Sequence, residues 1–550
     1  RLNGIHGLFQ VTEGVHQVRG YDLSNMTLIE GKTGWIVVDP LTSAETARAA
    51  LDLARRHLGE RPIRAVVLTH SHIDHFGGIG GVLPDEASRE GVPIVAPAGF
   101  LHEATSENVL AGIAMARRAS FMYGMPLARG ERGHVDSGLG KEPARGRIGL
   151  LAPTELVDHT PQEMEIDGVR FVFQYVPGSE APAELTFYLP EQKAWDGAEI
   201  VSHTLHNLYT LRGAKVRDAL VWSGYITEAI GLFPDVEIVF ASHHWPTWGH
   251  ERAVEYLEQQ RDTYRYLHDQ TLRLANGGAT PQEIAEAVKL PDSLAASFAN
   301  RGYYGTVKHN AKAVYQWYFG WYDGNPAHLD PLPPADASAR YVELMGGAAG
   351  VLQAATRAFE QGEYRWASML LDHLVFAEPE NREARELLAR CYDQLGYQAE
   401  SAPWRDVYLT GAWELRHGVS GSGVSLAAAM DLLRQVPMAR FFESMAARLD
   451  GEKAAGEQAT INFVFTDLGE SYVLDVKSGV LHHRQAEPDP EASATVQLTQ
   501  DFFLRLVTRQ LGLREALFSD ELDVDGSRVA LLSFFSLLEA PDEGFNIVTP

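Results

Sequence analysis

The chain has 550 residues, of which 45% are hydrophobic and 22% charged, and its formal net charge is −26 at pH 7. This length exceeds what one hydrophobic core supports, so we expect about three domains. The negative charge argues against nucleic acid and anionic membranes as partners, and no apolar run suggests stable membrane insertion. The single cysteine, Cys391, excludes internal disulfides and cysteine-rich zinc clusters, which leaves His, Asp and Glu as possible metal ligands.

The first elements lead to a cluster of histidines. Apolar residues at helical spacing predict a helix over residues 43–57, with Ser43 as its N-cap. A short apolar run at residues 65–68 then predicts a strand that ends at Thr69. Several glycines follow between residues 77 and 81 and allow tight turns. The cluster is therefore expected at a strand end beside a glycine-rich loop, a common place for functional residues.

The segment THSHIDHFGG, residues 69–78, contains three histidines and an aspartate. His70, His72 and Asp74 alternate, so an extended backbone points them to one side, and His75 can turn into the same space. Imidazole and carboxylate ligands suit zinc and similar divalent ions, and four ligands this close favour two neighbouring metals. The alternative is a histidine-rich surface loop held by hydrogen bonds.

The pattern H-x-H-x-D-H after a strand resembles the signature of the metallo-β-lactamase superfamily. The resemblance implies an αββα sandwich with a two-metal site at one edge, but it leaves the substrate open. The remaining ligands of that superfamily follow later strands. Here Glu180 stands where the usual pattern has a histidine, and Glu199 stands where a bridging aspartate belongs. Of the two histidines that end the pattern, 243 and 244, we take His244 as the ligand and the other as a supporting residue.

The glutamate at position 180 and the stretch NLYTLRGAKVRD, residues 207–218, resemble the alkylsulfatases of this superfamily, over essentially the whole chain. The resemblance implies hydrolysis of alkyl sulfate esters such as dodecyl sulfate, two zinc ions per chain and a homodimer. Because such enzymes are often exported, we expect a secreted or periplasmic protein, with the cytoplasm as the alternative. The implied metal ligands are His70, His72, Asp74, His75, Glu180, Glu199 and His244.

The stretch after Glu199 also has the composition of an anion pocket. Arg212 and Arg217 flank a Gly-Ala-Lys turn, and guanidinium groups bind tetrahedral oxyanions bidentately. Asn207 and Tyr209 supply neutral donors. A basic pocket of this kind would let an acidic protein bind a sulfate ester. The alternative is that both arginines form ordinary surface salt bridges.

Hydrolysis of a sulfate ester benefits from a general acid beside the ester oxygen. His309, in the segment GTVKHNAKAVYQWYFGWYDGNP, is our first choice, and Tyr123 in FMYGM is a weaker one. The alternative for His309 is a satisfied histidine at a helix start. An alkyl groove would use apolar residues, although such residues are more often core; the candidates include Phe121, Met122, Leu205, Leu208 and the aromatics of residues 317–322.

The rest of the chain predicts two further domains. Residues 273–417 are mainly helical, and Gly362 and Gly396 recur thirty-four residues apart, an internal repeat that resembles tetratricopeptide hairpins. So few repeats leave a face that must pack on a partner chain or on the first domain, which fits the dimerisation region of alkylsulfatases. After a linker at 417–425, residues 423–550 combine a predicted helix at 426–449 with strands and further helices, and resemble a sterol-carrier-like domain. The alternative for that domain is a plain structural cap.

These expectations combine into a multidomain α/β and α+β protein. Residues 1–272 form a metallo-β-lactamase-fold catalytic domain, 273–417 a helical dimerisation domain, and 423–550 the C-terminal domain. The predicted function is alkyl sulfate hydrolysis. The alternatives are another hydrolase of the same fold, such as a phosphoesterase or lactonase, and a non-catalytic lipid-binding protein with a structural metal. The sequence leaves open whether primary or secondary esters are the substrates.

Overall fold

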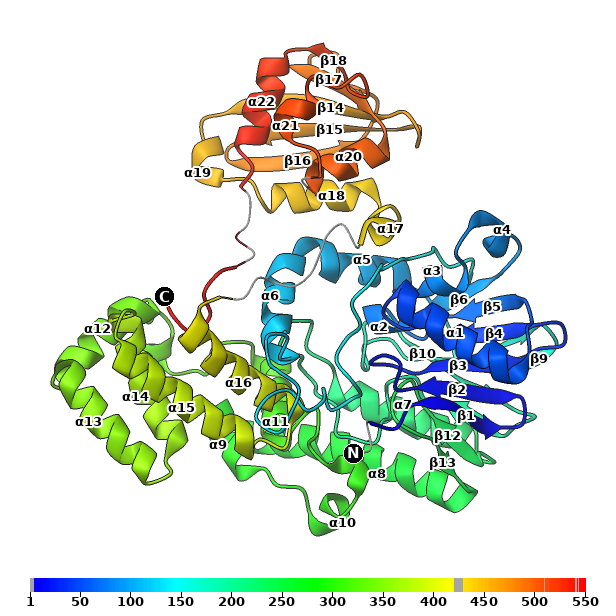
Figure 1. Cartoon of the computed structure of the whole chain (residues 1–550), viewed down its shortest axis with the longest axis horizontal. Coiled ribbons are helices and arrows are strands. Elements are labelled where there is room, and N and C mark those ends of the chain that lie inside the picture. Colours follow the sequence, from blue (N-terminus) through cyan, green and yellow to red (C-terminus); the bar gives the residue numbers. More distant parts are fainter. Residues whose placement is uncertain (1–3, 420–428, 509, 540–541, 543) are drawn as a thin grey trace.

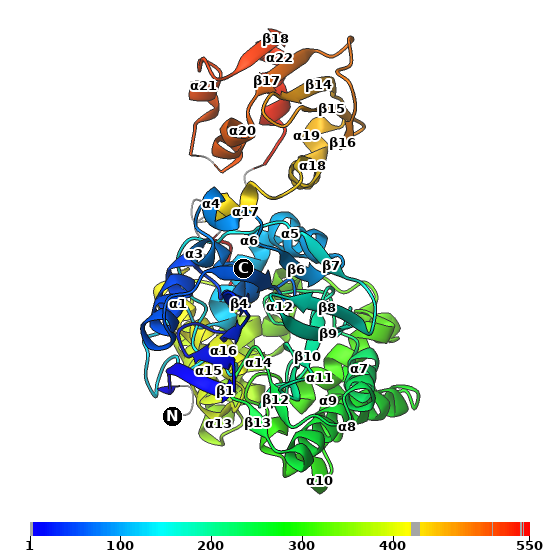
Figure 2. The ribbon, with the colours of Figure 1, turned by 90° about the vertical axis from the view of Figure 1, so that its right-hand side faces the viewer.

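The computed structural model describes residues 4–419, 429–508, 510–539, 542 and 544–550. A two-sheet domain comes first, a helical region follows, and a smaller α+β domain stands above both of them in the two views (Figures 1 and 2). None of the described helices has the combination of length and apolar character needed to cross a membrane.

Two mixed sheets form the first domain. The seven strands of the first sheet lie in sequence order, antiparallel up to β4 and parallel from there on. Their bounds are β1 Gly7–Thr12, β2 Val15–Arg19, β3 Met26–Glu30, β4 Trp35–Val38, β5 Ile63–Val67, β6 Ile94–Pro97 and β7 Glu155–Val157. The second sheet has the order β13-β12-β11-β10-β9-β8, and β11 and β12 are parallel. Its strands are β8 Gln162–Ile166, β9 Val169–Tyr175, β10 Leu185–Leu189, β11 Ala194–Asp196, β12 Ile238–Phe240 and β13 Thr247–Trp248.

The two sheets pack face to face, and helices cover their outer faces. Ile36 and Val67 of the first sheet share one buried cluster with Phe171 and Phe187 of the second. The helices that pack on the first sheet are α1 Ala44–Leu58, α2 Ile73–Phe76, α3 Ile79–Val82 and α5 Phe100–Leu110. Along the chain, α4 Glu86–Arg89 follows α3, and α6 Gly112–Met122 follows α5. The second sheet packs on α7 Ala219–Leu232, α8 His250–Ala275 and α11 Val307–Phe319. This is the predicted αββα sandwich, and Ser43 caps α1 as expected, by accepting from the Thr46 amide.

The helical region contains antiparallel hairpins, as the repeat predicts. Its elements are α9 Pro281–Ala287, α10 Asp292–Ala295, η2 Phe298–Asn300, η3 Pro326–His328, α12 Pro334–Leu344, α13 Gly347–Glu360, α14 Tyr364–Ala377, α15 Arg382–Gln398 and α16 Ala402–His417. Gly362 lies in the turn after α13 with φ 78°. Gly396 differs from Gly362, because it lies inside α15, where an added Cβ would meet Leu409 Cγ at 2.7 Å. The second glycine therefore permits close approach of α16 and makes no turn.

The C-terminal domain is a five-stranded sheet of order β16-β15-β14-β17-β18 with helices packed on it. Its strands are β14 Gln458–Phe465, β15 Glu470–Lys477, β16 Val480–Gln485, β17 Ala494–Leu498 and β18 Asp523–Gly526. Its helices are α17 Met430–Leu433, α18 Met438–Ala446, α19 Gly451–Ala454, α20 Gln500–Val507, α21 Leu513–Ala516 and α22 Arg528–Ser536. The single helix predicted at 426–449 is wrong within the described part: Pro437 lies at the N-cap of α18 and separates it from α17. Most of the predicted linker at 417–425 lies outside the described residues.

The last residues return to the junction of the first two regions. Arg117 of α6, which is fully buried, donates from Nε to the Phe545 carbonyl oxygen at 2.9 Å and forms an ion pair with Glu414 of α16. Val548 is buried in the core of the helical region. Figure 1 shows this end of the chain beside α16. The C-terminal segment thus links all three regions.

Candidate active site

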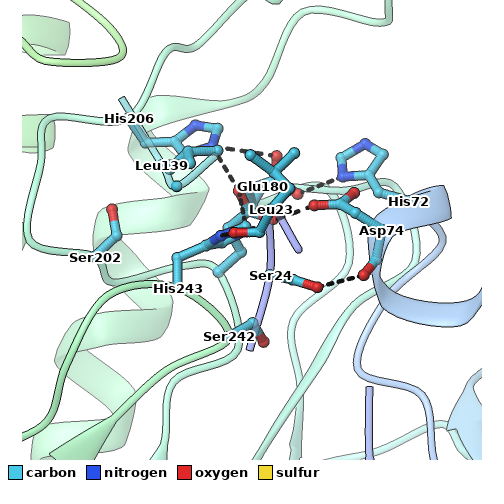
Figure 3. A network of polar contacts seen from close by, with 12 residues as sticks. Leu23, Ser24, His72, Asp74, Leu139, Glu180, Ser202, His206, Ser242 and His243 are labelled. Carbon is cyan, nitrogen blue, oxygen red and sulfur yellow. Dashed lines mark hydrogen bonds and ion pairs between the residues drawn. The ribbon is translucent and has the colours of Figure 1, made fainter. Parts of the chain in front are cut away.

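The predicted metal ligands meet where the strands of both sheets end. His70, His72, Asp74 and His75 follow β5, and Glu180 follows β9. Glu199 follows β11, and Ser242 and His243 follow β12. Figure 3 shows His72, Asp74, Glu180 and His243 converging on one region from these separate segments. Loops at sheet ends can adopt the irregular geometry that a site requires without disturbing the ladders.

The cluster consists of two groups of possible ligands. His70, His72, Glu180 and Glu199 form one group, and Asp74, His75 and His243 form the other; within each group the ligand atoms lie within 4.8 Å of one another. Glu199 connects the two. Its Oε2 lies 3.1 Å from His70 Nε2 and 3.2 Å from His75 Nε2, and its Oε1 lies 3.2 Å from His243 Nε2. The carboxylate of Glu199 is therefore placed to serve both groups.

In three of the histidines, one ring nitrogen faces the cluster without forming a hydrogen bond to the described residues. His70 Nδ1 lies 3.0 Å from Thr69 Oγ1, His75 Nδ1 lies 2.9 Å from Asp39 Oδ2, and His243 Nδ1 lies 3.1 Å from the Leu23 carbonyl oxygen. The Nε2 atoms of the same three rings are buried and have no hydrogen-bond partner among the described residues. Buried polar atoms are rarely left without a partner. Rings fixed through Nδ1 with Nε2 directed inward are typical of metal-binding histidines, so the donor set fits divalent ions.

The carboxylates of the cluster are held in their charged form. Burial alone would raise the pKa of Glu180, but the Arg217 guanidinium lowers that pKa to about 2. Burial opposes ionisation of Glu199 as well, and the His243 imidazole beside it brings its pKa well below the usual value. The pKa of Asp74 is likewise lowered, by His75 against the effect of burial. Three carboxylates in a buried site favour bound cations.

The structure replaces His244 by His243 in the cluster. His244 Nδ1 accepts from the His203 amide at 3.2 Å, and its Nε2 lies 3.3 Å from the Gly138 carbonyl oxygen. Its backbone has φ 64°, so the chain turns sharply between the two residues and the rings diverge. The sequence placed two histidines at the strand end, but the ligand choice between them depended on this turn. The structure therefore places His243 in the cluster, and it does not place the predicted ligand His244 there.

Arg217 has a different role from the predicted one. Its Nη1 donates to the Asn207 carbonyl oxygen at 2.8 Å and also to the Asn207 side chain, and its Nη2 forms an ion pair with Glu180. Its Nε donates to the Glu180 backbone oxygen. Both residues are buried, and these contacts occupy the guanidinium and the Asn207 oxygen. Arg217 is therefore committed to Glu180 and to the Asn207 oxygens in this structure. The Asn207 amide nitrogen, which could donate to an anion, takes no part in these contacts, so Asn207 stays a predicted anion contact.

Arg212 and Tyr123 are both partly exposed, unlike Arg217 and Asn207. Arg212 is partly exposed, and its charge lowers the pKa of Tyr123, although burial raises that pKa to about 12 overall. The charges of Asp74 and Glu199 act on Tyr123 too, and its hydroxyl is hydrogen-bonded to Tyr304. Tyr209 is directed elsewhere, because its hydroxyl accepts from the exposed Arg118 at 3.0 Å. Arg212, a predicted anion contact, and Tyr123, the weaker general-acid candidate, thus lie best for a ligand beside the cluster.

His309, at the first turn of α11, has both ring nitrogens occupied. Its Nε2 donates to the Tyr209 carbonyl oxygen at 2.5 Å, and its Nδ1 accepts from Trp404 Nε1 at 3.1 Å. Burial lowers its pKa to about 4. A neutral imidazole with this arrangement matches the alternative of a satisfied histidine. Its role as general acid stays a prediction.

A small apolar cluster lies at the same end of the domain. Leu23, Met122, Leu139 and Tyr304 pack together, with Tyr123 and Leu211 against them. Figure 3 shows Leu23 and Leu139 beside the polar side chains of the cluster. Of the predicted groove residues, Met122 belongs to this cluster. Phe121 packs in the helical core, and Leu205 and Leu208 pack behind the second sheet, so these three are core.

Sequence reasoning missed four buried residues around the cluster. Asp39 orients His75, and Glu184 accepts from the backbone amides of Glu180, Ala181 and Glu199. The other two are His206 and Tyr304, whose rings lie 4.8 Å apart. Asp39 directly follows β4, and this position at a strand end was a weak indication of a functional role. The others were isolated polar residues whose burial only the tertiary structure reveals.

Comparisons with known proteins agree with this architecture. Family models match residues 19–173 as metallo-beta-lactamase superfamily, 280–418 as alkyl sulfatase dimerisation and 426–550 as alkyl sulfatase C-terminal. The whole chain is 48% identical to a linear primary-alkylsulfatase of Pseudomonas sp., covering 82% of that protein. It is 44% identical to the alkyl/aryl-sulfatase BDS1 of Saccharomyces cerevisiae, again over the whole chain and over 85% of that protein.

A solved structure gives the same result. The stereoselective inverting sec-alkylsulfatase Pisa1 from Pseudomonas sp. matches with a TM-score of 0.94 and 45% identity, over 100% of this chain and 87% of the other. Relatives of this identity, aligned over the full length, together with family models for all three regions, confirm the resemblance seen in the motif and in residues 207–218. The chain therefore belongs to the alkylsulfatase family of the metallo-β-lactamase superfamily.

Proposed function

We propose that the protein hydrolyses alkyl sulfate esters to an alcohol and inorganic sulfate at a centre of two zinc ions. The observation that carries this proposal is the position of Glu199, whose two oxygens face both groups of possible ligands. The relatives, which are named as primary and secondary alkylsulfatases, support the substrate class. They do not favour one of these two ester types.

The donor set assigns ligands to each ion. His70, His72 and Glu180 would hold one ion, and Asp74, His75 and His243 the other, with Glu199 shared. The ions, when bound, supply Lewis acidity and an activated water near neutral pH. The protein contributes rigidity: Arg217 fixes Glu180, Asp39 fixes His75, and Glu184 holds the loop backbones of both glutamates.

We propose that Arg212 binds the sulfate group, with Tyr123 as a neutral donor. Arg212 is the predicted anion contact that is partly exposed and whose charge reaches Tyr123. With a pKa of about 12, the Tyr123 hydroxyl keeps its proton at neutral pH and can donate to an ester oxygen. This geometry favours Tyr123 over His309 as the donor to the ester oxygen, because both nitrogens of His309 are occupied.

The alkyl chain next to the ester would pack on the apolar cluster of Leu23, Met122 and Leu139. Tyr123 packs against the same cluster, and Leu23 and Leu139 lie beside the charged side chains (Figure 3). A phosphoesterase would need no such apolar surface at the same site.

We also propose a homodimer formed through the helical region. The dimerisation family model covers that region, and large apolar side chains are exposed on α12 and α14. Leu344 is 83% exposed, Met369 61% and Tyr341 52%. Exposed apolar groups that gather on one region commonly mark an interface. Light scattering on the purified protein tests this: a mass of one chain would contradict it.

The function is tested by sulfate release from dodecyl sulfate and from a secondary alkyl sulfate. We expect release from at least one ester, its loss after chelation and its return on addition of zinc. A zinc-loaded protein that released no sulfate from either ester would contradict the proposal.

A further inference from the structure

His206 is a buried histidine that belongs to neither group of possible ligands. It lies in the loop between β11 and α7, is 1% exposed, and packs its ring at 4.8 Å from Tyr304 and 5.5 Å from Trp222. Its Nε2 lies 3.0 Å from Glu199 Oε1 and 3.6 Å from Glu180 Oε1. Figure 3 shows the ring beside Glu180, on the side away from His72. His206 therefore faces both glutamates of the cluster, and one of them, Glu199, lies in the same loop.

The surroundings of His206 differ from those of the ligand histidines. In His70, His75 and His243, Nε2 has no hydrogen-bond partner among the described residues. In His206 both nitrogens face oxygen acceptors: Nε2 faces Glu199 Oε1, and Nδ1 lies 2.8 Å from the Asn207 carbonyl oxygen. His206 Nε2 thus forms a hydrogen bond to Glu199, and the residue belongs to neither group of possible ligands.

The backbone of His206 is fixed from three sides. Its amide donates to Tyr264 Oη of α8 at 3.2 Å, and its carbonyl oxygen accepts from Asn310 Nδ2 of α11 at 2.8 Å. Gly305 approaches so closely that an added Cβ would lie 2.6 Å from the same carbonyl oxygen. A ring held this firmly can set the orientation of the carboxylate that it contacts.

We propose that His206 is a positioning residue of the metal centre. By donating from Nε2 to Glu199 Oε1 it fixes the carboxylate so that Oε2 faces His70 and His75, the position from which Glu199 serves both ligand groups. The inference rests on the proposed metal centre and assigns the residue that orients its shared ligand. Losing such a partner typically costs about 10–100-fold in metal affinity or activity.

The test compares two variants of similar size. His206→Leu removes the donor, and His206→Gln keeps an amide donor within reach of Glu199. Both proteins are stripped of metal, checked for folding by circular dichroism and thermal unfolding, and titrated with zinc against a competing chelator. We expect His206→Leu to bind zinc about 10–100-fold more weakly, with kcat falling more than KM rises. His206→Gln should recover part of the affinity.

A matched control is available in the same loop. The His203 ring stacks between Trp245 and Tyr256, with centroids 4.8 Å from each. His203→Gln should leave zinc affinity unchanged. Equal affinity of wild type and a folded His206→Leu would overturn the inference. Loss of one whole zinc equivalent without rescue by Gln would also overturn it, because His206 would then be a ligand. A wild type that binds no zinc would instead overturn the metal centre itself.

Discussion

Glu199 Oε1 lies 3.2 Å from His243 Nε2, although these residues follow different strands of the second sheet. The parallel pairing of β11 and β12 brings their carboxyl ends to the same edge, and the residues beyond them therefore meet. His244 is directed away from this contact by the left-handed backbone at its own position. The contact between Glu199 and His243 thus joins the two groups of possible ligands.

From this pair we predict opposite effects for two adjacent histidines. His243→Ala should lose about one zinc ion per chain and nearly all sulfate release, because its Nε2 faces the ligand group. His244→Asn, which suits the left-handed backbone, should retain both ions. Metal analysis after dialysis measures both outcomes. A full zinc content in His243→Ala, with loss in His244→Asn, would restore the original assignment of His244.

Arg212→Ala should mainly weaken substrate binding. Hydrogen bonds to a charged group contribute roughly 1.5–3 kcal/mol, so we expect kcat/KM for an alkyl sulfate to fall about 10–100-fold. Arg212→Lys should lose less, because it keeps the charge but not the planar fork. Lys215→Ala is the control: this exposed lysine of the same loop pairs with Glu103 at 3.1 Å. Similar losses in Arg212→Ala and Lys215→Ala would argue against a specific sulfate contact.

The sequence predicted the sandwich, and it singled out most of the residues that the structure brings together in the cluster, because both depend on local patterns. His70 to His75 follow one strand, and each later candidate follows another. The orientation of side chains depends on tertiary contacts instead. Arg217 was expected on the anion, yet Glu180 reaches it from a loop 37 residues away and takes its guanidinium. His309 was expected to act on the substrate, but Trp404, 95 residues further along the chain, occupies its Nδ1.

Chelation should lower stability as well as activity. The Nε2 atoms of His70, His75 and His243 are buried without hydrogen-bond partners among the described residues, so a bound ion stabilises the folded state selectively. For each site, zinc at 100 times its dissociation constant stabilises by about 2.7 kcal/mol. Differential scanning calorimetry with and without chelator should show a lower Tm that zinc restores. An unchanged Tm would mean that these residues bind no ion tightly.

The buried pair Arg117–Glu414 should be important for stability. Arg117 has a side chain that is 0% exposed, and the partner carboxylate on α16 is 4% exposed. Glu414→Ala leaves a buried charge without its partner, which typically costs 3–5 kcal/mol. The control on the same helix is Arg416→Ala, which removes a partly exposed pair with Glu386 and should cost about 1 kcal/mol or less. Chemical denaturation measures both. Equal costs would show that burial of the first pair is unimportant.

The titration of His309 should lower the free energy of unfolding as the pH falls. Burial lowers its pKa from 6.5 to about 4 in the folded state, while the unfolded chain titrates near the ordinary value. Between these values the unfolded state binds a proton that the folded state does not, so this stabilising contribution is complete above about pH 6.5 and is lost as the pH falls towards 4. The slope is about 1.4 kcal/mol per pH unit for one group.

His309→Gln removes this titration and should flatten the decline of unfolding free energy between pH 6.5 and 5, measured by denaturant titration at fixed zinc concentration. The exposed histidine of α5 gives the control, since His102→Gln should leave the decline unchanged. If the unfolding free energy of His309→Gln declines as steeply with falling pH as that of the wild type, the wild-type imidazole takes up its proton in the folded state. Its role as a general acid would then regain support. A flattened curve would instead identify His309 as a neutral, structural link between Tyr209 and Trp404.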